Sequence, residues 1–143
     1  MLSGLILQQK YLGRSDCDSG MLRDVTSTKP VVLHICAREL IRELRDSILR
    51  MQGYEVISTL SIIEGEDMCA GKTFDLILVD VEGDGRVPQA EKLCAEVKHK
   101  HPEQKIAFVC NYRVSKESSC PDEIIHSDFN PEAMVQGVKE LLS

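Results

Sequence analysis

The chain has 143 residues, of which 43% are hydrophobic and 28% charged, a balance that fits one compact domain and excludes a disordered or fibrous chain. Its formal net charge is −6, and the lysines and arginines are scattered among acids, so we expect no direct nucleic-acid binding. No apolar stretch reaches the roughly 18 residues that span a bilayer, and residues 2–7 lack the charged flank and cleavage site of a secretion signal. The sequence therefore predicts a cytoplasmic protein that is not inserted in a membrane.

Six cysteines are spread along the chain without a Cys-x-x-Cys pair or a zinc-finger spacing. Several of them lie inside apolar periodic segments, where a thiol behaves as a small hydrophobic side chain. We therefore expect reduced thiols rather than a disulfide framework. The six are Cys17, Cys36, Cys69, Cys94, Cys110 and Cys120.

The N-terminal stretch differs in composition from the rest of the chain. Residues 1–29 mix Gly, Ser, Asp, Gln and Thr with few apolar anchors, and Pro30 marks where regular structure is expected to begin. We predict a flexible tail over 1–29, within which Met21 is an alternative start, and one domain over 30–143.

Short apolar runs and amphipathic segments alternate through the first half of this domain. Residues 31–36, Val-Val-Leu-His-Ile-Cys, form a nearly continuous apolar run, which is typical of a strand buried on both faces of a parallel sheet. Residues 38–51 are predicted to form an amphipathic helix, which Gly53 ends. The apolar positions of this helix are Ile41, Leu44, Ile48 and Met51.

A second strand and helix follow, and then the clearest strand of the chain. Residues 54–58 are β-branched and aromatic, and Ser61 and Glu64 have the Ser-x-x-Glu spacing of a capping box that opens a helix to about Ala70. Residues 74–80, Phe-Asp-Leu-Ile-Leu-Val-Asp, predict a buried strand that ends in a turn rich in glycine.

The C-terminal half repeats the alternation. Pro88 suits the first turn of a helix, and residues 106–110 and 123–126 predict two further strands. Asn130 can cap a last helix that starts at Pro131. The residues expected to face inward are Ala90, Leu93, Cys94 and Val97 in the first of these helices and Met134, Val138, Leu141 and Leu142 in the second.

Five short strands alternating with helices predict an α/β fold, a doubly wound five-stranded parallel sheet with helices on both faces. In the flavodoxin-like strand order 2-1-3-4-5, a site is expected outside the carboxyl ends of the first and third strands, where the winding reverses. This order places Cys36, Asp80 and Cys110 on one rim of the sheet.

The strand at 74–80 is similar to the third strand of response-regulator receiver domains, the CheY-like family of two-component signalling, whose final aspartate accepts phosphate from a histidine kinase. The helix that precedes Gly53-Tyr54-Glu55-Val56 resembles the first receiver helix, and residues 122–142 resemble the last strand and the terminal helix. The resemblance covers about residues 30–143. It implies that Asp80 stands at the phosphoacceptor position.

The other site positions depart from the family. A pair of acidic residues at the end of the first strand should hold magnesium beside the acceptor, but Cys36 and Ala37 stand there. Because Mg²⁺ prefers hard oxygen ligands, we expect it to bind weakly or not at all, and we expect no other cofactor. Cys110 and Ser127 stand where the family has a hydroxyl residue and a lysine. The chain thus resembles a degenerate receiver, or pseudo-receiver.

One connection is also shorter than in the family. The resemblance implies a helix between the fourth and fifth strands, but residues 111–121 leave little room for it. We expect this helix to be reduced to a turn or missing, which puts part of the family's usual output face in doubt.

Each of these residues also has a plainer explanation. Asp80 can be a strand-end aspartate that caps the following turn. A metal or redox pair at Cys36 and Cys110 competes with inert thiols, which apolar surroundings favour. Asp80 and Glu82 are weak candidates for binding a cation, because their acidic run lacks the further ligands of an EF-hand loop. His126 adjoins the lost lysine but is expected to face away.

The loop after the first strand has no glycine to cradle a phosphate, and no nucleophile with a matched base is recognisable, so we predict a protein that is not an enzyme. We predict a stand-alone receiver-like module of a phosphorelay that acts by protein-protein interaction. The expected partner is a histidine kinase or another signalling protein, and a homodimer stays open. Two alternatives are a receiver phosphorylated on Asp80 and a thiol or metal sensor that uses Cys36 and Cys110.

Overall fold

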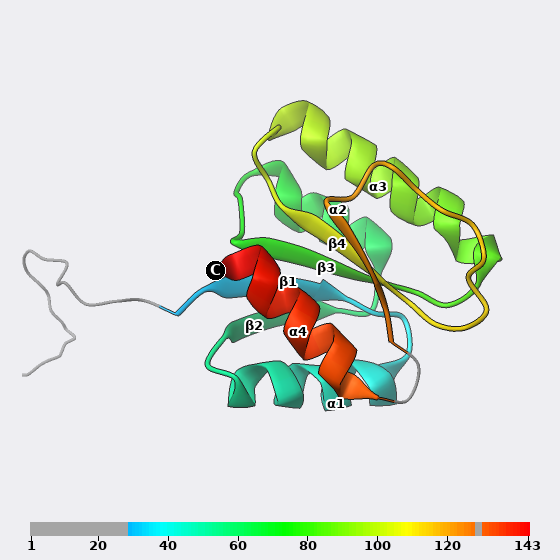
Figure 1. Ribbon diagram of the computed structural model, residues 1–143. Coiled ribbons are helices and arrows are strands. Elements are labelled where there is room, and N and C mark those ends of the chain that lie inside the picture. Colours follow the sequence, from blue (N-terminus) through cyan, green and yellow to red (C-terminus); the bar gives the residue numbers. More distant parts are fainter. Residues whose placement is uncertain (1–28, 128–129) are drawn as a thin grey trace, which may run out of the picture.

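The computed structural model describes residues 29–127 and 130–143 (Figure 1). The predicted tail, apart from Lys29, lies outside the described residues, as do Cys17 and Met21. The elements in chain order are β1 (Val31–Ile35), α1 (Glu39–Met51), β2 (Glu55–Thr59), α2 (Ile62–Ala70), β3 (Leu76–Val81), the 3₁₀ helix η1 (Asp84–Arg86), α3 (Val87–Lys100), β4 (Ile106–Cys110), β5 (Glu123–His126) and α4 (Pro131–Leu142).

The five strands form one parallel sheet in the order β2-β1-β3-β4-β5, which confirms the predicted flavodoxin-like arrangement. Helices α1 and α4 cover one face of the sheet, and α2 and α3 cover the other (Figure 1). The carboxyl ends of β1 and β3 therefore flank the point where the winding reverses. Among the described residues, no helix combines the length and the apolar character that a membrane span requires.

The central strands β1, β3 and β4 are buried on both faces, so their alternate residues enter two separate cores. The core beneath α2 and α3 contains Leu33, Ile35, Ile77, Val79, Val81, Ile106, Phe108 and Cys110 from these strands. The core beneath α1 and α4 contains Val32, Leu76, Leu78, Ala107 and Val109. All five described cysteines are free, as expected for reduced thiols.

The same alternation decides toward which face of the sheet each side chain at a strand end points. His34 lies between two residues of the α2/α3 core, so its ring points toward α1 on the other face. Asp80 follows the same parity in β3 and meets this ring. Cys110 packs with Phe108 in the α2/α3 core, on the opposite face. The predicted rim therefore does not hold for Cys110, whose thiol the sheet separates from Asp80.

Helix α1 does not present the face that its apolar periodicity predicts. Leu44 and Met51 were expected to point inward with Ile41 and Ile48, but they are 58% and 81% exposed. The buried residues of α1 are instead Asp46 and Leu49. The helix is turned so that its polar side chains lie over the carboxyl ends of the strands, because partners for them are buried there.

The connection between β4 and β5 contains turns and no helix, as the shortness of this segment suggested. Its middle is tied to the turn after β3, because Asp84 accepts hydrogen bonds from the backbone N–H groups of Ser115 and Lys116 at 2.8 and 3.0 Å. The Ser115 hydroxyl donates to the same carboxylate at 2.6 Å. These bonds hold an irregular segment against the sheet without a helix.

The predicted caps of two helices are present. The Ser61 side chain accepts from the backbone N–H of Glu64 at 3.2 Å and begins α2. The Asn130 side chain accepts from the backbone N–H of Glu132 at 2.8 Å and begins α4. The Glu64 carboxylate accepts a hydrogen bond from the Thr59 hydroxyl, so this interaction ties α2 to the end of β2.

We predict that Gly137→Ala destabilises the protein although alanine favours a helix. A Cβ at this position would lie 2.6 and 2.7 Å from Cδ1 and Cγ1 of the buried Ile125. Overpacking of this kind costs roughly 1–3 kcal/mol, against about 1 kcal/mol gained in helix propensity. Urea unfolding should show a net loss of stability. Gly71→Ala, where no atom lies within 4 Å, is the matched control and should show none.

Candidate functional site

Asp80 lies at the predicted place, near the carboxyl end of β3, but its carboxylate is closed off. Its side chain is only 2% exposed. The Arg45 guanidinium pairs with Oδ1 through Nη1. The Nε2 atom of His34 lies 2.6 Å from Oδ2. Both carboxylate oxygens therefore already have a strong partner from the protein itself.

His34 joins this carboxylate to a second one. Its ring is fully buried, and its Nδ1 atom lies 2.7 Å from Oδ1 of Asp46, which is 1% exposed. The imidazole thus bridges two buried aspartates, Asp46 from α1 and Asp80 from β3. This arrangement fixes both the position and the rotation of the ring.

The Asp46 carboxylate has further partners of its own. The Ser58 hydroxyl, from β2, donates to Oδ2 at 2.6 Å. Arg42, one turn before Asp46 in α1, lies 3.2 Å from the same oxygen and donates to the Ser58 hydroxyl at 2.8 Å. The polar cluster therefore reaches from β2 across β1 to β3, and α1 covers it.

Arg45 closes the cluster from the side of α4. Besides pairing with Asp80, its Nη2 atom donates to the backbone carbonyl of Ser127 at 3.3 Å. Ser127 stands at the position of the family's lysine, and its buried hydroxyl donates to the Asn130 carbonyl. The positive charge beside Asp80 is thus supplied by α1 rather than by the segment after β5.

The protonation of the cluster follows from burial and hydrogen bonding. Burial lowers the pKa of His34; the hydrogen bond to Asp46 and its charge oppose this effect, and the neighbouring arginines add to it. Burial alone would raise the pKa of Asp46, but hydrogen bonds from His34 and Ser58 outweigh it and hold the pKa below its usual value. Asp46 is therefore an ionised acceptor for the Nδ1–H of His34.

The contact of 2.6 Å between His34 and Asp80 must then contain a further proton. A neutral imidazole has one N–H, and Asp46 takes it at Nδ1, so Nε2 and the Asp80 oxygen would otherwise be two acceptors. One proton is thus shared between His34 and Asp80. Burial also lowers the pKa of Arg45, yet a guanidinium starts from so high a value that it stays charged.

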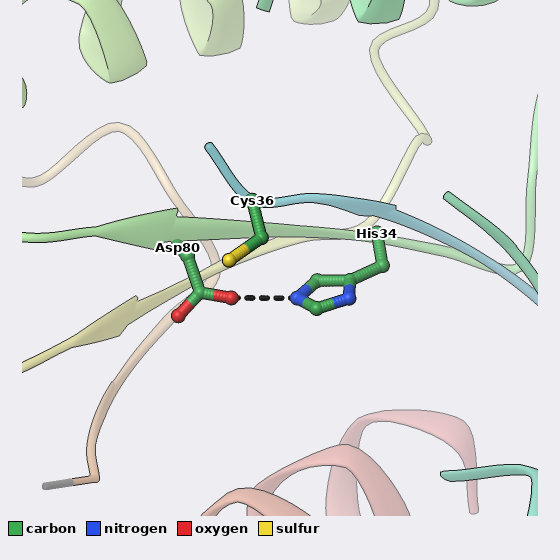
Figure 2. Close-up of side chains that lie close together, drawn as sticks. All are labelled: His34, Cys36 and Asp80. Carbon is green, nitrogen blue, oxygen red and sulfur yellow. Dashed lines mark hydrogen bonds and ion pairs between the residues drawn. The ribbon is translucent and has the colours of Figure 1, made fainter. Parts of the chain in front are cut away.

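Cys36 lies beside this pair, whereas Ala37 is exposed and adds no ligand atom. One ligand atom each of His34, Cys36 and Asp80 lies within 4.8 Å of the other two (Figure 2). The buried Cys36 thiol donates to the Arg38 carbonyl at 3.5 Å, and burial raises its pKa. Burial raises the pKa of Cys110 to about 11, in keeping with an inert core thiol.

The remaining candidates either have other partners or are exposed. Glu82 pairs with Arg38 at 3.2 Å, so the nearest acidic side chain after β3 already has a cation partner. Asp84 accepts hydrogen bonds from the β4 to β5 connection. His126 is exposed at the end of β5, as expected from the alternation of the strand.

A pocket of about 200 Å³ opens next to the cluster. It reaches Arg45 and Asp80 from outside, and its wall is strongly charged. Its lining residues are Arg38, Ile41, Arg45, Asp80, Val81, Glu82, Asn111, Tyr112 and Arg113.

These residues do not fit the magnesium ion that the resemblance implies. Mg²⁺ requires hard oxygen ligands in octahedral geometry, and the cluster offers a thiol, an imidazole and one carboxylate already paired with Arg45. The Arg45 guanidinium stands where a cation would bind the carboxylate.

Sequence reasoning missed His34, Arg45 and Asp46. The apolar run of β1 includes His34 among hydrophobic residues, and the apolar periodicity of α1 does not single out Arg45 or Asp46. Two features of the sequence could have indicated these residues. A histidine inside a buried strand needs polar partners, and the adjacent Arg45 and Asp46 in the helix that follows this strand can supply them.

Comparisons with known proteins agree on the fold. No family model matches the chain, and no curated protein does. The response regulator TrrA of Thermotoga maritima, solved with Mg²⁺ and BeF, is 23% identical, with a TM-score of 0.67 over 79% of this chain and 99% of that chain. A CheY-like receiver domain protein of Methanospirillum hungatei is 22% identical, with a TM-score of 0.66 over 80% of this chain and 94% of that chain.

A third structure, the histidine kinase ThkA in complex with TrrA, matches at 25% identity and a TM-score of 0.68 over 80% of this chain and 99% of that chain. The structural neighbours are thus receiver domains of two-component systems, one of them seen with its kinase. The chain has the flavodoxin-like fold that these CheY-like domains share.

Proposed function

We propose that this chain is an atypical receiver-like signalling module that is not an enzyme and acts by binding another protein. The observation that carries the proposal is the closed state of Asp80, whose two carboxylate oxygens are held by Arg45 and His34. A conventional acceptor must expose an oxygen to the phosphoryl donor and to a metal. Here that exposure requires breaking a buried ion pair and a buried hydrogen bond.

Helix α1 offers a surface for a protein partner. Leu40, Leu44 and Met51 are 80%, 58% and 81% exposed. At about 100° per residue their directions fall within roughly 40° of one another, so they form one apolar stripe. We define these three residues as the α1 stripe. An exposed apolar stripe on a helix is the surface that packs against another helix in a complex.

We propose a histidine kinase as the partner that covers the α1 stripe. TrrA, which has the same fold, is seen in complex with the kinase ThkA. A kinase bound to a closed module would be held without passing on phosphate. The module would then act by keeping the kinase in a complex in which it transfers no phosphate.

The first prediction that follows from this proposal concerns phosphorylation. Incubation of the chain with acetyl phosphate and Mg²⁺ should give no stable stoichiometric phosphorylation in intact-mass spectra, because both Asp80 oxygens are paired and the cluster does not suit magnesium. A conventional receiver treated in parallel verifies the reagent. One phosphoryl group per wild-type chain, absent from Asp80→Asn, would mean that the chain is instead a working phosphoacceptor.

The second prediction concerns the strength of the ion pair. Arg45→Met and Asp80→Asn, with the double variant, should give a coupling energy of about 1–3 kcal/mol in urea unfolding. The side chains are only 13% and 2% exposed, so solvent screens the pair weakly. The more exposed Lys98 and Asp122 pair is the control and should couple by less than about 1 kcal/mol. Equal coupling in both pairs would contradict the closed state.

The third prediction concerns the α1 stripe. Leu44→Glu should leave the free energy of unfolding within about 0.5 kcal/mol, since the side chain is exposed. The affinity of the Leu44→Glu variant for purified histidine kinases of the source organism should be at least tenfold lower than that of the wild type. Ile63→Glu on α2, on the opposite face and 69% exposed, should not change the affinity. Binding to no kinase, or equal binding by Leu44→Glu, argues against this surface.

A further inference from the structure

We propose that His34, Cys36 and Asp80 form a binding site for a zinc-class divalent transition-metal ion, with water as a fourth ligand. Figure 2 shows the three side chains converging from the ends of β1 and β3. The site differs from the predicted pair of Cys36 and Cys110, because Cys110 lies on the opposite face. It does not depend on the proposed binding of a kinase.

The spacing of the three ligand atoms is close to that of a tetrahedral site. They lie within 4.8 Å of one another, and the imidazole and the carboxylate are 2.6 Å apart. Zinc bonds of about 2.0–2.3 Å in tetrahedral geometry place ligand atoms roughly 3.3–3.6 Å apart. Movements of the order of 1 Å, within reach of side-chain rotation, would therefore seat the ion.

The ligand set and its charge also suit this ion. Imidazole nitrogen, thiolate sulfur and carboxylate oxygen are the three common protein ligands of zinc, whereas Mg²⁺ and Ca²⁺ take oxygen ligands. A thiolate from Cys36 and the Asp80 carboxylate together neutralise a divalent cation, which matters because the site is buried. The thiol proton and the proton between His34 and Asp80 would both pass to solvent when the ion binds.

The supporting residues are already in place. Asp46 accepts the Nδ1–H of His34 and so directs Nε2, the nitrogen that would bind the ion after losing its shared proton, toward Asp80. A carboxylate that orients a histidine ligand in this way is typical of zinc sites. Ser58 and Arg42 in turn fix the Asp46 carboxylate, so the histidine ligand is held rigidly before any metal arrives.

Arg45 is the competitor of the ion. It pairs with Asp80 and lines the pocket of about 200 Å³, which can admit water to the fourth ligand position. The negatively charged Glu82 lines the same pocket and offers Arg45 another partner. The positive charge of Arg45 therefore competes with the ion for the Asp80 carboxylate, and removal of Arg45 should tighten binding.

The test is a titration of the reduced full-length chain with Co²⁺ and Zn²⁺, against a chromophoric chelator. We expect one ion per chain and a near-ultraviolet charge-transfer band from sulfur to cobalt. Cys36→Ala should remove the band and weaken binding at least tenfold. Asp46→Asn should weaken it by about 10-fold or more, as loss of an orienting carboxylate does. Arg45→Gln should strengthen it while the stoichiometry stays at one ion per chain.

The matched control is Cys110→Ala, an equally buried thiol on the other face of the sheet. It should keep the stoichiometry, the band and the affinity of the wild type, as should the double variant Cys94→Ala and Cys120→Ala. Circular dichroism of every variant verifies the fold. The proposal is overturned if no ion binds at one per chain, if Cys36→Ala binds as the wild type does, or if Arg45→Gln binds more weakly. Failure of this test leaves the kinase proposal standing, because Leu44 lies outside the site.

Discussion

The buried carboxylate of Asp80 is the constraint on which the arrangement around it depends. A charge with a side-chain exposure of 2% is stable only if nearby groups replace the water that it has lost. Arg45 supplies the opposite charge, and His34 supplies a hydrogen bond. The ring of His34 is itself fully buried and needs a partner for its second nitrogen, which Asp46 provides. Each buried polar group thus requires the next.

The partners that Asp80 and His34 need explain the orientation of α1. Arg42, Arg45 and Asp46 are needed over the carboxyl ends of β1, β2 and β3, so the helix turns its polar face inward there. Leu44 and Met51 are consequently exposed. The closed site and the α1 stripe have the same cause. The same rotation of α1 turns Arg45 and Asp46 toward the sheet and Leu44 and Met51 toward solvent.

Under the proposed metal site, Arg45 and the bound ion would compete for the Asp80 carboxylate. With Arg45 in place, the carboxylate has its charge balanced by the protein and needs no metal. With a soft or borderline metal ion in place, Cys36 and His34 would hold the cation and Arg45 would be released toward the pocket. Hard ions gain nothing from the thiol and the imidazole, so we expect the ligand types of the cluster, rather than its size, to disfavour magnesium.

Local sequence patterns were enough to predict the fold and the place of Asp80. Apolar runs such as 106–110 and caps such as Asn130 are local signals, and the structure has each element where they predict it. The partners of Asp80 were decided only by the tertiary structure. His34 and Asp46 are 12 residues apart, and Arg45 and Asp80 are 35 apart, so no local pattern relates them. The alternation of side chains along β4 places Cys110 on the opposite face of the sheet from Asp80. The orientation of α1 follows from packing, because its charged side chains pair with polar groups of β1, β2 and β3.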